Sequence, residues 1–164
     1  MDTTAWETYH RRAAALRDVV ARLERDGELV WDPDVFADEA DVLVALHDLW
    51  TRRLETRIDL ALELHDIPGD SVAEAWREVA AELAAVRRVL DAHAHDPALA
   101  AHELHEHRLV AVAVGLATLS DPVVHSARLG RAYVAKVRSV VPAPRDGWLA
   151  DRMGGFFRRL AASA

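Results

Sequence analysis

Apolar side chains recur three and four residues apart along almost the whole chain, and this spacing restricts the fold more than any other feature of the sequence. Residues three and four positions apart lie on one face of an α-helix, so each run predicts a helix with one apolar side. The first run alternates strictly in this way: Trp6, Tyr9, Ala13, Leu16, Val20 and Leu23. No stretch alternates apolar and polar residues as a half-buried strand does. The pattern predicts an all-α fold.

Capping patterns indicate where four of the helices begin. They are Thr4-x-x-Glu7, Ser71-x-x-Glu74, Asp96-Pro97 and Asp121-Pro122. The first two are capping boxes, and the last two place an aspartate N-cap before a proline at the first helical position. The helices are therefore expected at about 4–26, 38–65, 71–90, 97–119 and 122–141.

Short connections between these helices favour antiparallel neighbours, so we expect an antiparallel helical bundle of four to five main helices within residues 1–141. The segment "PAPRDG" then predicts a linker, and residues 142–164 form a separate unit with a short C-terminal amphipathic helix. Its apolar edge is flanked by arginines, which allows docking on the bundle, on a partner or on a membrane surface. The edge consists of Leu149, Met153, Phe156 and Leu160.

Composition limits the kinds of partner. The 164 residues correspond to one domain, and the absence of cysteine excludes disulfides and thiolate metal sites. The net charge of −7, without a recognisable basic recognition helix, argues against a nucleic-acid partner. The N-terminus lacks a signal-peptide pattern, and the longest apolar stretch is too short to span a membrane, so we expect a cytoplasmic protein with no transmembrane segment.

Five of the nine histidines fall within residues 93–107, "HAHDPALAAHELHEH". On a helical wheel, His102, His105 and Glu106 share the side of the apolar stripe, and antiparallel folding brings His47 of the 38–65 helix to the same level. Imidazole and carboxylate groups on facing helices can share a metal. His47, His102, His105 and Glu106 are therefore the candidate ligands of a divalent metal such as zinc.

Two other interpretations of the histidines stay open. Within residues 93–107 the Glu-x-x-His and His-Glu-x-x-His spacings of known metal sites are absent, so the cluster can instead be the open, solvated end of the bundle, satisfied by water and by glutamates, with no cofactor. Alternatively, it can be a pH-responsive group, because histidine changes charge near neutral pH.

No catalytic motif is present, since the serines lack a nucleophile-elbow context and no glycine-rich phosphate loop follows a strand. We therefore expect a non-enzymatic, self-associating interaction protein. The segment "LVAVAVGLATL" is apolar on nearly every side, so it requires either a central position or a partner, and Gly115 and Gly130 would permit close helix contacts. We expect a homodimer around this segment or the C-terminal edge, with Trp6, Trp50 and Trp76 in the core.

The chain resembles uncharacterised small all-helical proteins of high-GC actinobacteria, through "WETYHRR", "WDPDVFADEADVLVALHDLW", "AWREVAAELAAVRRVLD" and "EHRLVAVAVG". These pieces cover most of residues 6–115, and the resemblance implies a shared helical bundle without a substrate. The chain is also similar, by analogy, to metal-binding four-helix bundles of the DinB type. That analogy implies a histidine on the second helix, here His47, and a further pair one turn apart on a later helix. The pair would be Glu103 with His107 or His102 with Glu106, although the other motifs of that family are missing.

Overall fold

The computed structural model describes residues 3–64 and 68–140, and within these residues the protein is helical without a strand, which confirms the predicted all-α class. The elements are α1 (Thr3–Asp26), α2 (Glu39–Leu64), α3 (Pro68–Glu82), α4 (Ala84–Ala92), a 3₁₀ turn η1 (Pro97–Leu99), α5 (Ala100–Ala113) and α6 (Val123–Ser139). No helix among the described residues is long and apolar enough to cross a membrane. The proposed boundary at residue 141 and the C-terminal helix lie outside the described residues.

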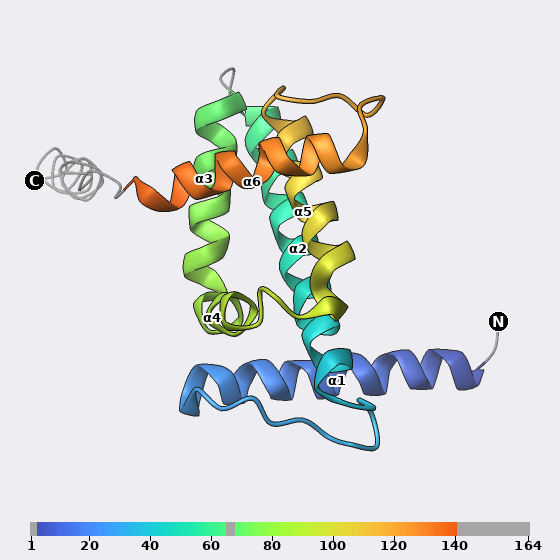
Figure 1. The fold of residues 1–164 in the computed structure, drawn as a ribbon. Coiled ribbons are helices and arrows are strands. Elements are labelled where there is room, and N and C mark those ends of the chain that lie inside the picture. Colours follow the sequence, from blue (N-terminus) through green and yellow to red (C-terminus); the bar gives the residue numbers. More distant parts are fainter. Residues whose placement is uncertain (1–2, 65–67, 141–164) are drawn as a thin grey trace, which may run out of the picture.

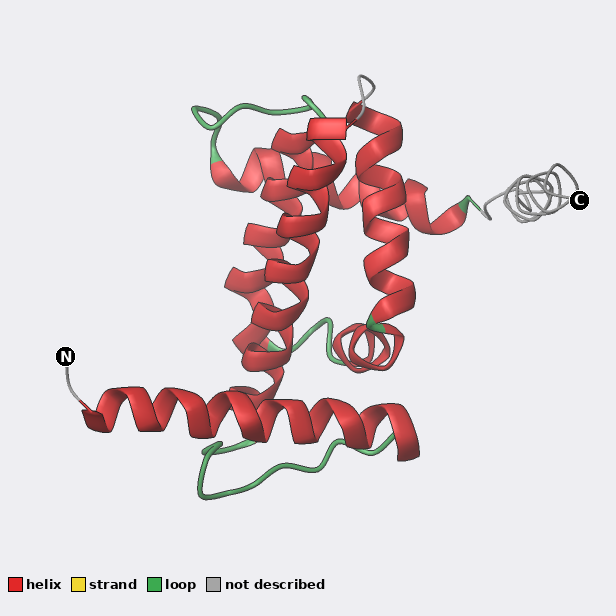
Figure 2. Ribbon diagram, turned by 180° about the vertical axis from the view of Figure 1, so that it is seen from behind, coloured by secondary structure: helices red, strands yellow, loops and turns green. Residues whose placement is uncertain are grey.

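Three helices run alongside one another and the others cross them (Figure 1). Helix α3 runs antiparallel to α2, as expected from the short connection between them, whereas α5 runs beside α2 in the same direction. Helix α1 lies across one end of this group, and α6 crosses one face of α3 and α5 nearer the opposite end; Figure 2 shows the same arrangement from behind. The arrangement therefore differs from a bundle in which every helix follows one axis.

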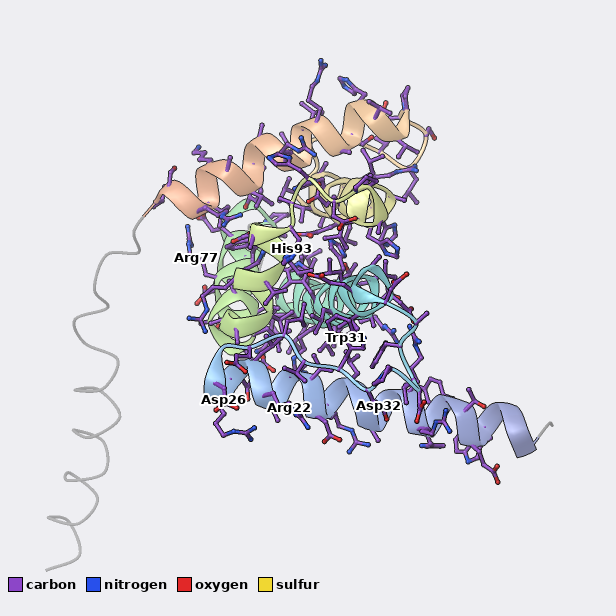
Figure 3. The ribbon with its side chains drawn as sticks, turned by 60° about the horizontal axis from the view of Figure 1, so that its bottom comes forward. Arg22, Asp26, Trp31, Asp32, Arg77 and His93 are labelled. Atoms are coloured by element: carbon purple, nitrogen blue, oxygen red, sulfur yellow. The ribbon has the colours of Figure 1, made fainter. Side chains whose placement is uncertain are left out.

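The connector between α1 and α2 explains the crosswise position of α1. Gly27 ends the helix with a positive φ of 74°, and Trp31 and Asp32 then lie in a segment that returns along α1 (Figure 3). The Asp32 carboxylate accepts a hydrogen bond from the Asp34 amide at 2.9 Å and stabilises a turn at Asp32-Pro33. Arg12 then ties α1 to the start of α2 through a 3.1 Å hydrogen bond to Asp41.

The core is built around α2 and α3. The rings of Trp50 and Trp76 meet edge to face at 5.7 Å, and Phe36 of the connector is also buried, so two of the three tryptophans predicted for the core lie there. Trp6 does not, because 58% of its surface is exposed near the projecting end of α1. Its place on the predicted stripe was right, but nothing in the described chain covers that end.

Two boundaries around α3 differ from the prediction. The helix begins at Pro68, and Ser71 lies buried inside the first turns, so the Ser71-x-x-Glu74 pattern is not its start. A proline is well suited to the first helical position because it has no amide proton to satisfy there. The apolar stripe continues as expected to Leu90, but the helix breaks at Leu83, where φ is −108° and ψ is 38°, and α4 turns away from α3.

The capping patterns had mixed outcomes. Asp96 caps η1 as predicted, with its carboxylate accepting from the Ala98 amide at 2.8 Å. Asp121 does not cap α6; its carboxylate instead accepts from the amide and hydroxyl of Thr118 and closes a turn in the preceding loop. Helix α5 ends at Ala113, because Gly115 takes a positive φ of 74° that redirects the chain.

Helices α5 and α6 approach each other very closely at Gly130. A Cβ atom placed on this glycine would lie 1.7 Å from the carbonyl oxygen of His107, so only a residue without a side chain fits there. This confirms the close contact predicted for Gly130, whereas Gly115 serves the turn. The contact between these two crossing helices is the most extensive one between helices of the described residues.

Candidate functional site

The histidine and glutamate singled out by the sequence meet in the interior. His47 of α2 and Glu106 of α5 are 1% and 2% exposed, and the His47 Nε2 atom lies 3.2 Å from the Glu106 Oε2 atom. At this distance the imidazole is in direct polar contact with the carboxylate. The other ring nitrogen, Nδ1, lies 3.1 Å from the Thr51 hydroxyl one turn further along α2. The histidine ring is thus held from both sides.

Arginine completes this interior cluster. Arg87 of α4 places one guanidinium nitrogen 3.6 Å from the Glu106 Oε1 atom and another 2.8 Å from Asp91. Its guanidinium carbon lies 4.9 Å from the centre of the Trp50 ring, a favourable cation–π position. Arg138 of α6 then pairs with Asp91. We call these five residues, His47, Glu106, Arg87, Asp91 and Arg138, the charged network.

The electrostatics of the network favour an ionised glutamate. Burial alone would raise the pKa of Glu106, but the contact with His47 and the charge of Arg87 outweigh it and lower the pKa to about 2. Both carboxylate oxygens have a partner: Oε2 lies beside the His47 ring and Oε1 beside the Arg87 guanidinium. Because the ion pairs satisfy one another, the arrangement resembles a structural network more than an open ligand set.

The two other predicted site residues lie toward solvent. The ring of His102 lies 5.7 Å from that of His47, but its Nδ1 atom contacts Asp48 at 3.1 Å. His105 is exposed. His102 and His105 line a polar pocket of about 340 Å³ between α2 and the start of α5, together with Asp48, Thr51 and Glu55.

The four candidate ligands therefore divide into two pairs rather than one set. His47 and Glu106 face each other inside, and His102 and His105 face the polar pocket. Within residues 3–64 and 68–140, no three histidine, aspartate or glutamate side chains are arranged to hold a metal ion. The metal site stays a prediction.

The remaining clustered histidines have separate roles. His93 contacts Glu39 at 3.1 Å and the Val89 carbonyl at 2.8 Å, so it ties the end of α4 to the start of α2. The backbone of His107 faces Gly130, and burial lowers the pKa of its imidazole. Glu103 pairs with Arg131 of α6 at 3.6 Å, so the DinB-type pair of Glu103 and His107 does not meet His47 in a common site.

A larger apolar groove lies elsewhere, between α1 and α2. It has a volume of about 500 Å³ and a floor of aliphatic side chains: Ala13, Leu16, Val20, Val44, Ala45 and Leu49. Tyr9 stands at one end, and charged residues of both signs form the edges, including Arg17, Glu24 and Arg52. A mostly apolar concavity of this size is typical of sites that receive a ligand or a partner side chain.

Several residues of these sites were not predicted. Arg87 and Asp91 are spaced four residues apart, as are His47 and Thr51, and this spacing on a helix is a detectable signal for side-chain pairing. The groove could not be found in this way, because its floor residues look like ordinary core positions in the sequence.

Comparison of the chain with known protein families, curated proteins and solved structures finds no match. The function is therefore argued from the charged network, the polar pocket and the groove alone.

Proposed function

We propose that this protein is a non-enzymatic interaction module that self-associates through α1. The observation that carries the proposal is the incomplete burial of the α1 stripe. Leu23, at one end of the stripe, is buried against the rest of the chain, whereas at the other end 58% of Trp6 and 60% of Tyr9 are exposed. Both views show the N-terminal half of α1 extending past the other helices (Figures 1 and 2).

The spacing of this stripe suits a helical partner. Positions alternating three and four residues apart form the seam by which two helices pack side by side. Trp6, Tyr9 and His10 already contact one another at the free end, with the rings of Trp6 and His10 4.1 Å apart. Exposed aromatic side chains at the end of an apolar seam are characteristic of interaction surfaces.

A second copy of the chain supplies both halves of such an interface. Each copy has an aromatic end that needs a cover and an apolar groove that can receive one. A two-fold axis makes the two contacts equivalent, which gives a closed dimer rather than a filament. The groove edges carry Arg17 and Arg52 as well as Glu24, so one copy can offer opposite charges to the other.

This proposal places the interface away from the two positions that the sequence suggested. In the segment "LVAVAVGLATL", Val110 and Ala111 are buried and Val114 packs on the core, so much of its apolar surface is already covered. The C-terminal edge lies outside the described residues. At the α1 surface, by contrast, Trp6 and Tyr9 are mostly exposed beside an open apolar groove.

The oligomeric state tests the proposal directly. Analytical ultracentrifugation of the full chain should give a dimer, and Tyr9→Glu should give a folded monomer because a buried unpaired charge at the interface is unfavourable. Leu60→Glu is the matched control, since Leu60 is an exposed aliphatic residue of α2 that does not line the groove, and it should leave the dimer intact. A wild-type monomer at high concentration, or a Tyr9→Glu dimer, would reject the proposal.

A second candidate is binding of a divalent metal or another ligand at the polar pocket. It is favoured by the neighbouring rings of His47 and His102 and by the pocket that His102 and His105 line. Its test is the response of thermal stability to zinc, described below.

A further inference from the structure

Charge is distributed very unevenly along this chain, although its net value is only −7. Residues 1–107 contain 11 basic and 24 acidic side chains, whereas residues 108–164 contain nine basic and three acidic ones. Helix α6 has four basic residues and no acidic residue: Arg128, Arg131, Lys136 and Arg138. An acidic protein therefore carries one distinctly basic helix.

The basic residues of α6 lie largely on its solvent face. The buried side of α6 consists of small and aliphatic residues such as Ala127, Val134 and Val137, so the charged positions point away from the core. Arg138 and Arg131 are partly neutralised by Asp91 and Glu103. Arg128 and Lys136 are exposed and form no ion pair with an acidic side chain of the described residues, which leaves their charge available to an anionic partner.

The N-terminal end of this face is apolar. The loop before α6 and its first turn expose four aliphatic side chains: Leu116, Leu119, Val123 and Val124. Leu119 is 78% exposed and Val124 is 71% exposed. Hydrogen bonds hold this loop in place: Asp121 closes a turn on Thr118, and Arg108 donates to the Leu119 carbonyl at 2.6 Å.

The geometry points to α6 and its preceding loop as a surface that binds anionic lipid membranes. Basic side chains are attracted to acidic headgroups, and exposed aliphatic side chains can enter the boundary between headgroups and acyl chains. Nucleic acid would attract the same cations, but it offers nothing to the aliphatic residues of the loop. The combination of the two features in one surface therefore favours lipid.

The acidic remainder of the molecule sets the orientation of this contact. Helix α1, which lines the groove, lies at the end of the molecule away from α6 (Figure 1), and the acidic residues 1–107 are repelled by an anionic surface. The protein is therefore attracted to an anionic membrane only when α6 faces the membrane. Salt should weaken this attraction because the interacting charges are exposed. The inference is independent of self-association, which uses α1.

Co-sedimentation of the full chain with vesicles tests this surface. The protein should bind vesicles of an equal mixture of phosphatidylglycerol and phosphatidylcholine, should not bind pure phosphatidylcholine, and should be released by high salt. Each basic residue near such a surface strengthens binding about fivefold, so Arg128→Gln with Lys136→Gln should weaken it about thirtyfold. The matched control is Arg22→Gln with Arg25→Gln, the same loss of charge from α1 at the other end.

A second pair of variants tests the aliphatic contribution. Leu119→Ser with Val124→Ser should weaken vesicle binding by about tenfold or more, whereas Val30→Ser, an exposed aliphatic residue of the α1–α2 connector, should not. Unchanged circular dichroism would establish that each variant is folded. The inference is overturned if the wild type ignores anionic vesicles, if the α6 variants bind as well as the wild type, or if duplex DNA binds and only the charge variants affect it.

Discussion

The charged network makes stability depend on the ionisation of one glutamate. The ordinary pKa of 4.5 for Glu106 falls to about 2 in the folded protein, chiefly because the contacts with His47 and Arg87 overcome the effect of burial. Each pH unit of this difference corresponds to about 1.4 kcal/mol, so the ionised carboxylate contributes about 3 kcal/mol to folding at neutral pH. Glutamine keeps the shape of the side chain without its charge, and Glu106→Gln should lower the free energy of unfolding by about that amount.

The dependence on pH has a definite sign. A carboxylate with a lowered pKa in the folded state stabilises the protein above its unfolded pKa and loses this effect as the pH falls toward the folded value. The contribution of Glu106 is therefore complete above pH 4.5, and about 2 kcal/mol of it is lost by pH 3. The difference in stability between wild type and Glu106→Gln should shrink accordingly, from about 3 kcal/mol at pH 7 to about 1 kcal/mol at pH 3.

Urea unfolding followed by circular dichroism measures this difference at each pH. Subtracting the variant from the wild type removes the contributions of groups that do not interact with Glu106. His107 is not among them, because the Glu106 charge raises its pKa against the effect of burial, so its titration is part of the measured difference. Glu55→Gln serves as the control, because Glu55 is exposed on α2 and its replacement should change stability little at any pH. A Glu106→Gln penalty that is small at pH 7, or that stays constant down to pH 3, would refute the reasoning.

Two further perturbations follow from the geometry. Gly130→Ala should destabilise the protein by several kcal/mol in thermal unfolding, because its Cβ would meet the His107 carbonyl oxygen at 1.7 Å. Gly115→Ala should cost only about 1–2 kcal/mol, because Gly115 has a positive φ but open space around it. Equal losses of stability in the two variants would contradict this reasoning. Equimolar zinc should leave the melting temperature unchanged, because His47 and Arg87 already occupy the Glu106 carboxylate. A zinc-induced rise that grows with pH and disappears in His102→Ala would instead establish the metal site.

Helix type and approximate extent were predictable here because they depend on local spacing. Helix α2 was expected at 38–65 and spans Glu39–Leu64. Asp96 caps the 3₁₀ turn η1, as predicted. The break at Leu83 was not predictable, since Leu83 and its neighbours are good helix formers and the bend comes from tertiary packing. The position of α1 across the other helices likewise depends on long-range contacts such as Arg12 with Asp41.

The residues of the candidate sites were likewise predictable only where local helical spacing decides their position. A helical wheel correctly placed His47 and Glu106 on inward faces, but it could not show that His105 turns to solvent while Arg87 enters from α4. The basic character of α6 was visible in the sequence and was missed, because the net charge conceals it. Charge counted helix by helix would have revealed it.

The contacts around Gly130 and Arg138 close a ring through three helices. Helix α5 touches α6 where the His107 backbone meets Gly130, α6 reaches α4 through Arg138 and Asp91, and α4 returns to α5 through Arg87 and Glu106. No member of the ring can separate without breaking contacts to both others. The amide protons of α4, α5 and α6 should therefore exchange with solvent through one common opening event, so that these helices unfold and refold as a single cooperative unit.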